Sequence, residues 1–236
     1  GNTMIPWVRQ ITRVPSQIKR ARGSFLFTND NQKIIDFTAG AMAVNLGHGN
    51  KAILDSIVDN TENGISYLPI NGFSTTTRNV LSSKILEFAG KNYSKVFYTN
   101  GGVDANESAD FIAREYHKHV RNGRKKSLAL CKSFHGGSTI AGSLMGGDPR
   151  REPKKTHYSL PFFPIIPNPL MSDMGEQSLS FTETQFRSGD VSSLMLEGSS
   201  GTAGCFLYPK GYLEQIRVLC DQYNVLLICD EVMSGW

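Results

Sequence analysis

Three turn-like segments of the chain each follow an apolar stretch, and together they carry the residues best suited to chemistry. They are residues 99–102, 133–137 and 230–232. In open α/β sheets, ligands bind outside the carboxyl ends of the strands. If the apolar stretches are parallel strands, we expect the three segments to meet at one edge of a sheet.

The first segment could bind an anion. Gly101 and Gly102 carry no Cβ, so the backbone there can approach a ligand closely. A helix that starts just after them would add free N–H groups and the positive end of its dipole, which suits a phosphate group. The same pair of glycines is as readily only a tight turn.

The second segment combines the aromatic ring of Phe134, the imidazole of His135 and the flexible backbone of Gly136. Taken alone, this segment is better interpreted as an ordinary loop with a packed phenylalanine. It becomes a candidate binding loop only beside the other two segments.

The third segment starts with Asp230, which ends the apolar run 225–229. Burying a carboxylate without a partner is costly, so a function is the preferred interpretation. Opposite a pyridine nitrogen, Asp230 would keep that nitrogen protonated, and a protonated ring stabilises a carbanion. The alternative is an aspartate that caps the following turn. Glu197 ends another apolar run, and for it a functional and a structural role are equally open.

Composition is that of an ordinary soluble protein. The 236 residues are 39% hydrophobic and 19% charged, and the net charge of +4 is scattered. The basic clusters at 121–126 and 150–155 favour solvated loops over a nucleic-acid patch. No stretch reaches the ~20 apolar residues of a membrane span, and the N-terminus lacks a signal-peptide core. We therefore expect neither nucleic acid nor membrane as a partner.

The cysteines give a prediction about location. The chain has four, none of them in a C-x-x-C pair, and no histidine pair has the spacing of metal ligands. A zinc site is therefore not expected. A reducing cytoplasm fits this cysteine usage best.

Periodicity and turn residues predict the elements that position these segments. Residues 1–50 form an N-terminal segment that contains a β-hairpin at 23–38, and residues 51–236 form the first part of a larger domain. Helices are predicted at 51–60, 75–89, 104–120 and 209–223, strands at 95–99, 127–131, 192–198 and 224–231, and an irregular segment at 146–185. This is an α/β fold with a mainly parallel sheet and helices on both faces.

Two burial patterns follow from this reading. The strand 224–231 is almost fully apolar, as expected when both faces of a parallel sheet are covered. The buried stripe of helix 104–120 is predicted to be Ala105, Ala109, Ile112, Ala113, Tyr116 and Val120.

Several motifs together resemble one family. They are NLGHG (45–49), TNGGVDANE (99–107), SFHGG (133–137), GDPRR (147–151), PKGYL (209–213) and LLICDEVMSG (226–235). In order and spacing they resemble the class III aminotransferases, which depend on pyridoxal 5'-phosphate, and most closely the ω-amino-acid type. The resemblance covers about residues 7–236.

The resemblance implies a role for each site residue. Asp230 is similar to the partner of the pyridine nitrogen, and Glu197 to a strand-end glutamate near the cofactor, so these two are the candidate catalytic residues. The candidate cofactor-binding residues are Gly101, Gly102 and Val103 at the phosphate, Phe134, His135 and Gly136 in the ring-stacking loop, and Asp230 and Val232 at the ring. Family members are fold-type I dimers with active sites at the subunit interface. The resemblance implies that residues 51–236 are the first part of the large domain and that residues 1–50 are the N-terminal segment of the small domain.

The chain departs from the family at several places. Glu197 is followed by Gly198 where relatives have proline, and Val103-Asp104 replaces a commoner small residue and glutamate. The Schiff-base lysine of the family would lie after residue 236. Lys132 is the only lysine here near a strand end, and an exposed structural role suits it better. Trp7 could line a substrate pocket or simply pack, and the substrates themselves are not predicted.

Four hypotheses stay open. The preferred one is the N-terminal subunit of a split aminotransferase, in which a second polypeptide supplies the lysine and completes the sheet, as a heterotetramer. The second is a fragment of a full-length enzyme. The third is a non-catalytic binding or regulatory protein. The fourth is an assembly that performs another reaction of this fold, such as that of an aminomutase or a lyase.

Overall fold

The computed structural model describes residues 16–69, 71–120, 123–138, 140–141, 164–170, 173–201 and 204–235. Trp7 and the motif 147–151 lie outside these residues. The chain forms two compact units, Gly1–Lys95 and Val96–Trp236. Each unit is described by itself.

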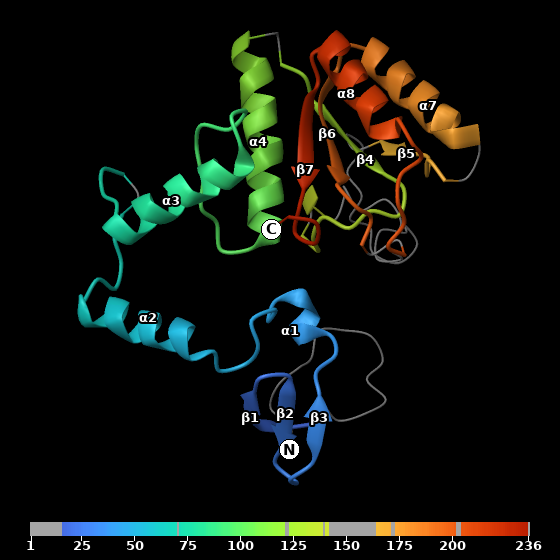
Figure 1. Ribbon diagram of the computed structural model, residues 1–236. Coiled ribbons are helices and arrows are strands. Elements are labelled where there is room, and N and C mark those ends of the chain that lie inside the picture. Colours follow the sequence, from blue (N-terminus) through green and yellow to red (C-terminus); the bar gives the residue numbers. More distant parts are fainter. Residues whose placement is uncertain are drawn as a thin grey trace. The chain divides into compact units, whose positions relative to one another are not determined.

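The first unit contains a three-stranded antiparallel sheet in the order β1-β2-β3 (Figure 1). Its strands are β1 (Ile18–Arg22), β2 (Phe25–Thr28) and β3 (Lys33–Ile35). The β2–β3 pair confirms the predicted hairpin, and Asn31 in its turn has a left-handed φ of 67° that asparagine tolerates. Strand β1 is not predicted from the sequence, because three of its five residues are basic.

Three helices follow in this unit: α1 (Ala39–Met42), α2 (Lys51–Glu62) and α3 (Thr76–Ala89). The side chain of Asn50 caps α2 by accepting from the N–H groups of Ala52 and Ile53, and Thr75 caps α3 through the N–H of Arg78. Both helix predictions are confirmed. Neither helix has a fully buried residue, and most of their large apolar side chains are exposed.

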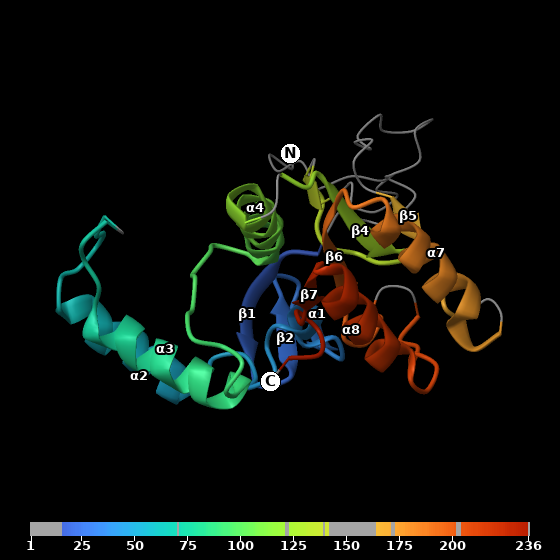
Figure 2. The same ribbon diagram turned by 90° about the horizontal axis from the view of Figure 1, so that it is seen from above.

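The second unit contains a parallel sheet in the order β5-β4-β6-β7 (Figure 2). Its strands are β4 (Lys126–Leu130), β5 (Ile165–Ile166), β6 (Val191–Glu197) and β7 (Leu226–Asp230). The strands predicted at 127–131, 192–198 and 224–231 are therefore confirmed. Parallel pairing brings the carboxyl ends of these strands to one edge of the sheet.

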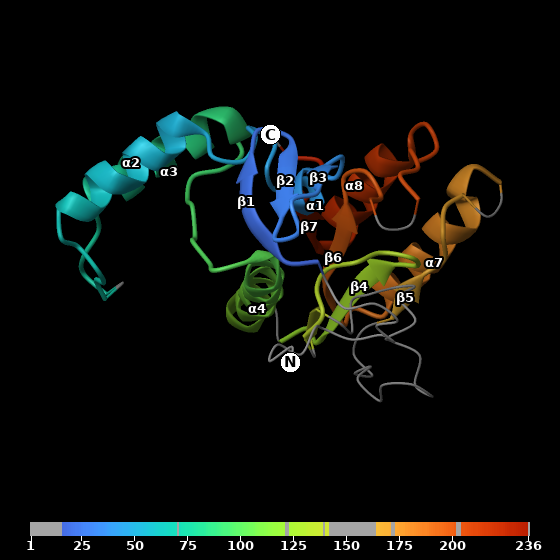
Figure 3. The same ribbon diagram turned by 90° about the horizontal axis from the view of Figure 1, so that it is seen from below.

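Helices cover both faces of this sheet (Figures 1 and 3). α4 (Gly102–Val120) lies on one face, and α7 (Glu176–Arg187) and α8 (Tyr212–Tyr223) lie on the other. A short 3-10 helix, η2 (Asp173–Gly175), leads into α7. The main core lies on the α7–α8 side, where Phe186, Leu194 and Ile216 are fully buried. Each such side chain contributes about 1.5–3 kcal/mol to folding.

Residues 95–99 do not form the predicted strand. The side chain of Phe97 is 67% exposed. A β-prone run becomes a strand only beside a neighbouring strand, and the edge strands β5 and β7 pair with β4 and β6 instead.

Of the predicted buried stripe of α4, only Ala113 is confirmed as buried. Ile112, Tyr116 and Val120 are exposed, whereas the residues that α4 buries are Asn106, Asp110, Ala113 and His117. The helix therefore turns a mainly polar stripe inward, and it can do so because those polar groups are hydrogen-bonded. Asp110 accepts a hydrogen bond from Ser127, and His117 Nε2 lies 3.0 Å from the carbonyl oxygen of Ser192.

The other differences concern segments whose burial does not follow apolarity. Strand β5 and most of α7 fall in the stretch predicted to be irregular. The helix α7 lacks a clear apolar stripe, because two of its three buried residues are the polar Ser178 and Thr182. Strand β7 is only half-buried, and Cys229 is exposed, so its two faces are not both covered by described residues. Among the described helices, none combines the length and apolar character needed to cross a membrane.

Candidate functional site

Two carboxylates end neighbouring strands at the same level. In the β6–β7 ladder, Glu197 is paired with Asp230. Both residues are buried, with exposed fractions of 7% and 8%. Since a buried carboxylate needs partners, the contacts of these two side chains define the site.

Asp230 is held by three donors from three different segments. Its Oδ2 lies 2.8 Å from Asn106 Nδ2 on α4 and 2.8 Å from His135 Nδ1 in the loop after β4. Its Oδ1 accepts the N–H of Val232 at 3.1 Å. The contact with the Val232 N–H is the turn cap that the sequence indicates as an alternative role for Asp230. Asp230 makes this contact in addition to the two side-chain contacts.

These contacts keep Asp230 charged. Burial raises the pKa of its carboxyl, but the hydrogen bonds from His135, the Val232 N–H and Asn106 outweigh burial and lower the pKa below its ordinary value. Asp230 is therefore a fixed negative charge at the end of β7 at neutral pH.

His135 is directed toward Asp230 and is itself 2% exposed. Its Nδ1 contacts the carboxylate, while its Nε2 is buried with no hydrogen-bond partner among the described residues. A histidine that donates from Nδ1 presents a bare acceptor at Nε2. The loop thus has one further polar atom available inside the site.

Glu197 holds the neighbouring loops through their backbone. Its Oε1 accepts the N–H of Phe134 at 3.0 Å, and its Oε2 accepts the N–H of Gly201 at 2.8 Å. Tyr208 donates its hydroxyl to the Glu197 carbonyl oxygen at 2.8 Å. Both carboxylate oxygens of Glu197 are therefore occupied, and they fix the position from which Phe134 projects.

The glycine pair lies at the start of α4, as predicted. The carbonyl oxygen of Gly101 accepts the N–H of Ala105 at 3.0 Å, which makes the first helical hydrogen bond. The amides of the first helical turn therefore have no acceptor within the helix and can face an anion. A Cβ added to Gly102 would lie 3.3 Å from Val232 Cγ2, so this turn comes close to the segment after Asp230.

The first turn of α4 also contacts the loop after β4. Gly136 has a φ of 133°, and an added Cβ there would lie 2.7 Å from Val103 Cγ2 and 2.9 Å from the Cβ of Ala141. Only glycine fits this backbone conformation and this approach. The structure therefore brings Val103 and Gly136 into one packed contact.

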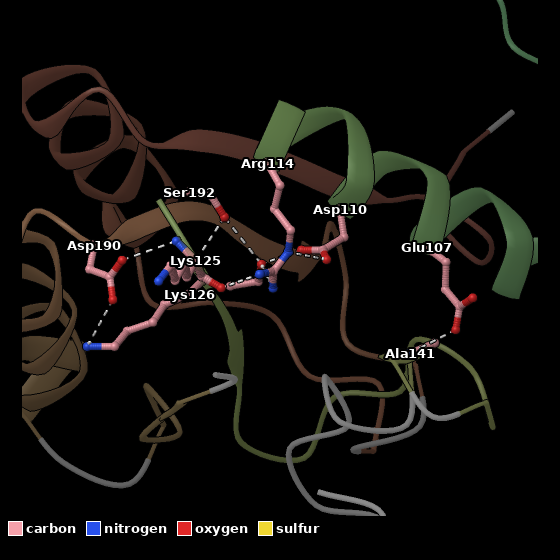
Figure 4. A network of polar contacts seen from close by, with 9 residues as sticks. Glu107, Asp110, Arg114, Lys125, Lys126, Ala141, Asp190 and Ser192 are labelled. Carbon is pink, nitrogen blue, oxygen red and sulfur yellow. Dashed lines mark hydrogen bonds and ion pairs between the residues drawn. The ribbon is translucent and has the colours of Figure 1, made fainter. Parts of the chain in front are cut away.

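A polar network anchors the middle of α4 to the opposite end of the sheet, where β4 and β6 begin (Figure 4). Arg114 Nε donates to Asp110 Oδ2 at 2.8 Å, and Arg114 also donates to the hydroxyl of Ser127 at 3.0 Å. Ser192 Oγ donates to the carbonyl oxygen of Lys126 at 2.8 Å. This network holds the helix that carries Gly102 and Asn106.

Apart from Trp7, the candidate residues of the sequence lie in the second unit, and hydrogen bonds and close packing join most of them. Asp230 meets His135, Phe134 meets Glu197, Val103 meets Gly136, and Gly102 approaches Val232. Lys132 is exposed and has a φ of 61°. No contact of Lys132 with these residues is seen in the described chain.

Two residues of the site were missed. Asn106 and Glu107 both contact the loop after β4: Asn106 Nδ2 donates to the His135 carbonyl oxygen at 2.9 Å, and Glu107 accepts from Ser138 and from the N–H of Ala141. The signal was the spacing of the polar residues 106, 110 and 117 on one face of a helix.

Known proteins with similar sequences agree on one family. A family model described as "Aminotransferase class-III" matches residues 8–236. Diaminobutyrate--2-oxoglutarate transaminase of Halomonas elongata is 30% identical over 237 residues, which are 93% of this chain and 50% of that protein. The chain spans about half the length of the curated relatives it matches.

Solved structures give the same picture. Taurine:2-oxoglutarate aminotransferase from Bifidobacterium kashiwanohense, in complex with PLP and glutamate, has a TM-score of 0.85 and 30% identity, covering 99% of this chain and 54% of that one. A transaminase from the marine bacterium Virgibacillus has a TM-score of 0.88 at 22% identity, which shows the fold alone. The predicted fold class, part of a transaminase domain with a parallel sheet, is confirmed.

Proposed function

Because the chain belongs to the class III aminotransferases, we propose that it forms one part of the active site of an enzyme that transfers amino groups. The enzyme moves an amino group from an amine or amino acid to a 2-oxo acid or an aldehyde. Its cofactor is pyridoxal 5'-phosphate, which is present in the solved relative from B. kashiwanohense.

The observation that carries this proposal is the setting of Asp230. It is a buried carboxylate at the end of a parallel strand, kept charged by Asn106, His135 and the Val232 N–H. Its three donors come from separate segments, α4, the loop after β4 and the turn after β7, so the charge lies where these segments meet. Such an arrangement suits a group that must hold a proton on a ligand.

The residues present fit the cofactor. The donor set has a fixed carboxylate for a pyridine nitrogen at Asp230 and a helix end without side chains at Gly101 and Gly102 for a phosphate. An added Cβ at Gly101 would meet nothing within 4 Å, whereas at Gly102 it would meet Val232. The phosphate end and the ring end of the cofactor are thus matched by residues that the structure brings close together.

Each residue has a proposed role. When bound, pyridoxal phosphate supplies an electron sink, because its protonated ring withdraws electrons from the substrate carbon. Asp230 would hold the proton at the ring nitrogen, and Phe134 and Val232 would pack against the ring. Glu197 orients Phe134 by accepting its backbone N–H. Val103, His135 and Gly136 complete the loop contacts around the ring.

The reaction also needs a lysine that bonds to the cofactor and moves the proton of the substrate carbon. We place this lysine outside these 236 residues, on a second polypeptide that completes the sheet, in a heterotetramer. The open side of β7 supports an added partner segment, since among the described strands β7 pairs only with β6. The alternative is that the lysine lies further along the same polypeptide.

Native mass spectrometry after borohydride reduction tests the proposal, because reduction fixes the cofactor to its lysine. A second polypeptide that carries the reduced cofactor would support the split enzyme. A reduced cofactor on a longer polypeptide that contains this chain would support a single-chain enzyme. If the complete protein binds no pyridoxal phosphate, the aminotransferase proposal fails and a non-catalytic role replaces it.

We propose a 2-oxo acid as the amino acceptor. Two of the similar proteins have 2-oxoglutarate in their names, so a 2-oxo acid is the first acceptor to test. A panel of donors with one acceptor, followed by product analysis, separates amino transfer from amine migration or elimination. We also propose a cytoplasmic location, which suits four cysteines that are all free thiols.

A further inference from the structure

The side-chain amide of Asn106 lies between two parts of the site that are far apart in sequence. Its Nδ2 is 2.9 Å from the carbonyl oxygen of His135 and 2.8 Å from Asp230 Oδ2. The residue is 7% exposed. An amide nitrogen carries two hydrogens, so both are committed, one to the loop after β4 and one to the end of β7.

Glu107 and Val103, which lie in the same helical turns as Asn106, contact the loop after β4. Glu107 points from α4 toward Ala141 and accepts its N–H at 3.3 Å (Figure 4). Val103 packs against Gly136. Asn106 therefore differs from its neighbours, because it alone among these three also contacts the carboxylate of Asp230.

The position of Asn106 along α4 links the carboxylate to the helix end. Asn106 follows Gly102 by four residues, so the two lie on the same side of the helix about 6 Å apart along its axis. A helix is rigid over one turn. The distance from the helix end to the Asp230 carboxylate is then fixed by the contact that Asn106 makes.

The remaining buried polar residues of α4 have a different task. Asp110 contacts Ser127 and Arg114, and His117 contacts the carbonyl oxygen of Ser192. These contacts hold the helix on the sheet away from the carboxyl ends of the strands. Asp110 therefore offers a matched comparison: a buried polar residue one turn further along the same helix.

We propose that Asn106 is a positioning residue that fixes the Asp230 carboxylate, together with the Phe134–His135 loop, at a set spacing from the Gly101–Gly102 turn. This inference rests on the proposed function, because pyridoxal phosphate is a rigid ligand whose ring end would meet Asp230 and whose phosphate end would meet the Gly101–Gly102 turn. The spacing between these two parts of the site therefore matters for its binding. Asn106 acts through Asp230 and the loop.

The test compares Asn106→Leu with Asp110→Asn in the complete protein, including whatever segment supplies the lysine. Leucine has the same branched shape as asparagine, although its two methyl groups are bulkier than the amide, and it donates no hydrogen bond. Carbon-13 NMR of labelled aspartate in the cofactor-free protein reports the pKa of Asp230. Equilibrium titration with pyridoxal phosphate reports its dissociation constant, and thermal melting reports folding.

With Asn106→Leu, we expect a raised pKa of Asp230 and a dissociation constant for pyridoxal phosphate about tenfold higher, as for a lost hydrogen bond to a charged group. With Asp110→Asn, the melting temperature falls, but the pKa of Asp230 stays at its wild-type value and the dissociation constant changes less than about twofold. Asn106→Ser, which keeps one donor, should lie between wild type and leucine in both readouts.

Two results would overturn the inference. One is an Asp230 pKa and a dissociation constant that respond alike to Asn106→Leu and Asp110→Asn. The other is that both Asn106 variants fail to fold while Asp110→Asn folds, since Asn106 would then be structural. The two proposals can fail separately, because the NMR measurement needs no cofactor. If the wild-type protein binds no pyridoxal phosphate, the proposed function is disproved, but the effect of Asn106 on the pKa of Asp230 can still be measured.

Discussion

Glu197 and Asp230 are paired in the β6–β7 ladder, so two buried carboxylates end adjacent parallel strands at one level. Their partners divide the work. Glu197 binds backbone N–H groups of Phe134 and Gly201, whereas Asp230 binds side chains and one N–H. Glu197 therefore fixes the backbone of two loops, whereas Asp230 is contacted by side chains from α4 and from the loop after β4.

Asp230→Asn should reduce turnover by about 100-fold or more, because the site loses the charge that stabilises the protonated ring. The amide keeps the shape of the side chain, so the protein should still fold. Steady-state kinetics of the complete enzyme and circular dichroism measure the two effects. Asp221→Asn, an exposed aspartate on α8, is the control, and normal turnover in Asp230→Asn would remove the role assigned to it.

Acid should lower the free energy of unfolding partly by protonating Asp230. A carboxyl whose pKa is lowered on folding contributes stability that is full above its unfolded pKa of about 3.9 and is lost as the pH falls through the folded value. The free energy of unfolding of wild type should therefore approach that of Asp230→Asn as the pH falls below about 4. Urea titrations from pH 7 down to pH 3 measure it, and a constant difference between the two proteins would contradict the prediction.

Phe134→Ala should raise the dissociation constant of pyridoxal phosphate about tenfold, through lost contact with the ring. Dialysis followed by absorbance of the retained cofactor measures it. Phe181→Ala is the matched control, since Phe181 packs against the core of the α7–α8 side and should lower the melting temperature without changing retention. Equal retention in wild type and Phe134→Ala would exclude Phe134 from the site.

Gly136→Ala should destabilise the protein by about 1–3 kcal/mol and weaken cofactor binding, because the new methyl group collides with Val103 and Ala141. Gly204→Ala is the control for backbone strain. Gly204 has a similar φ of 118°, but an added Cβ there would meet nothing within 4 Å. Adding Val103→Ala to Gly136→Ala should recover part of the loss, and urea unfolding that shows no recovery would disprove the contact.

The sequence predicts the sheet of the second unit well. Apolar runs that end at Glu197 and Asp230 become parallel strands, and the candidate loops follow them. The run at 95–99 is also rich in β-branched and aromatic residues, but it pairs with no strand among the described residues. Strand formation depends on a distant partner, which a local pattern does not contain.

Burial on helices was harder to predict. The large apolar side chains predicted to be buried on α4 are exposed, because burial there is decided by the hydrogen bonds of Asn106, Asp110 and His117. In α7 the buried residues likewise include the polar Ser178 and Thr182, so the apolar periodicity of a helix is weak there. A polar residue can be assigned to an interior only when its partner is known, and partners such as Asp230 lie more than a hundred residues away.

The inward polar stripe of α4 has a consequence for how the helix can move. A helix seated on leucines can slide by a residue at modest cost, since one methyl group replaces another. For α4, the same slide would strand several buried donors and acceptors at once, each costing roughly 1–3 kcal/mol. The helix therefore has a single allowed seating. Replacing the buried polar residues of α4 by apolar ones would make the protein more stable, but the helix would then pack on the sheet in more than one position.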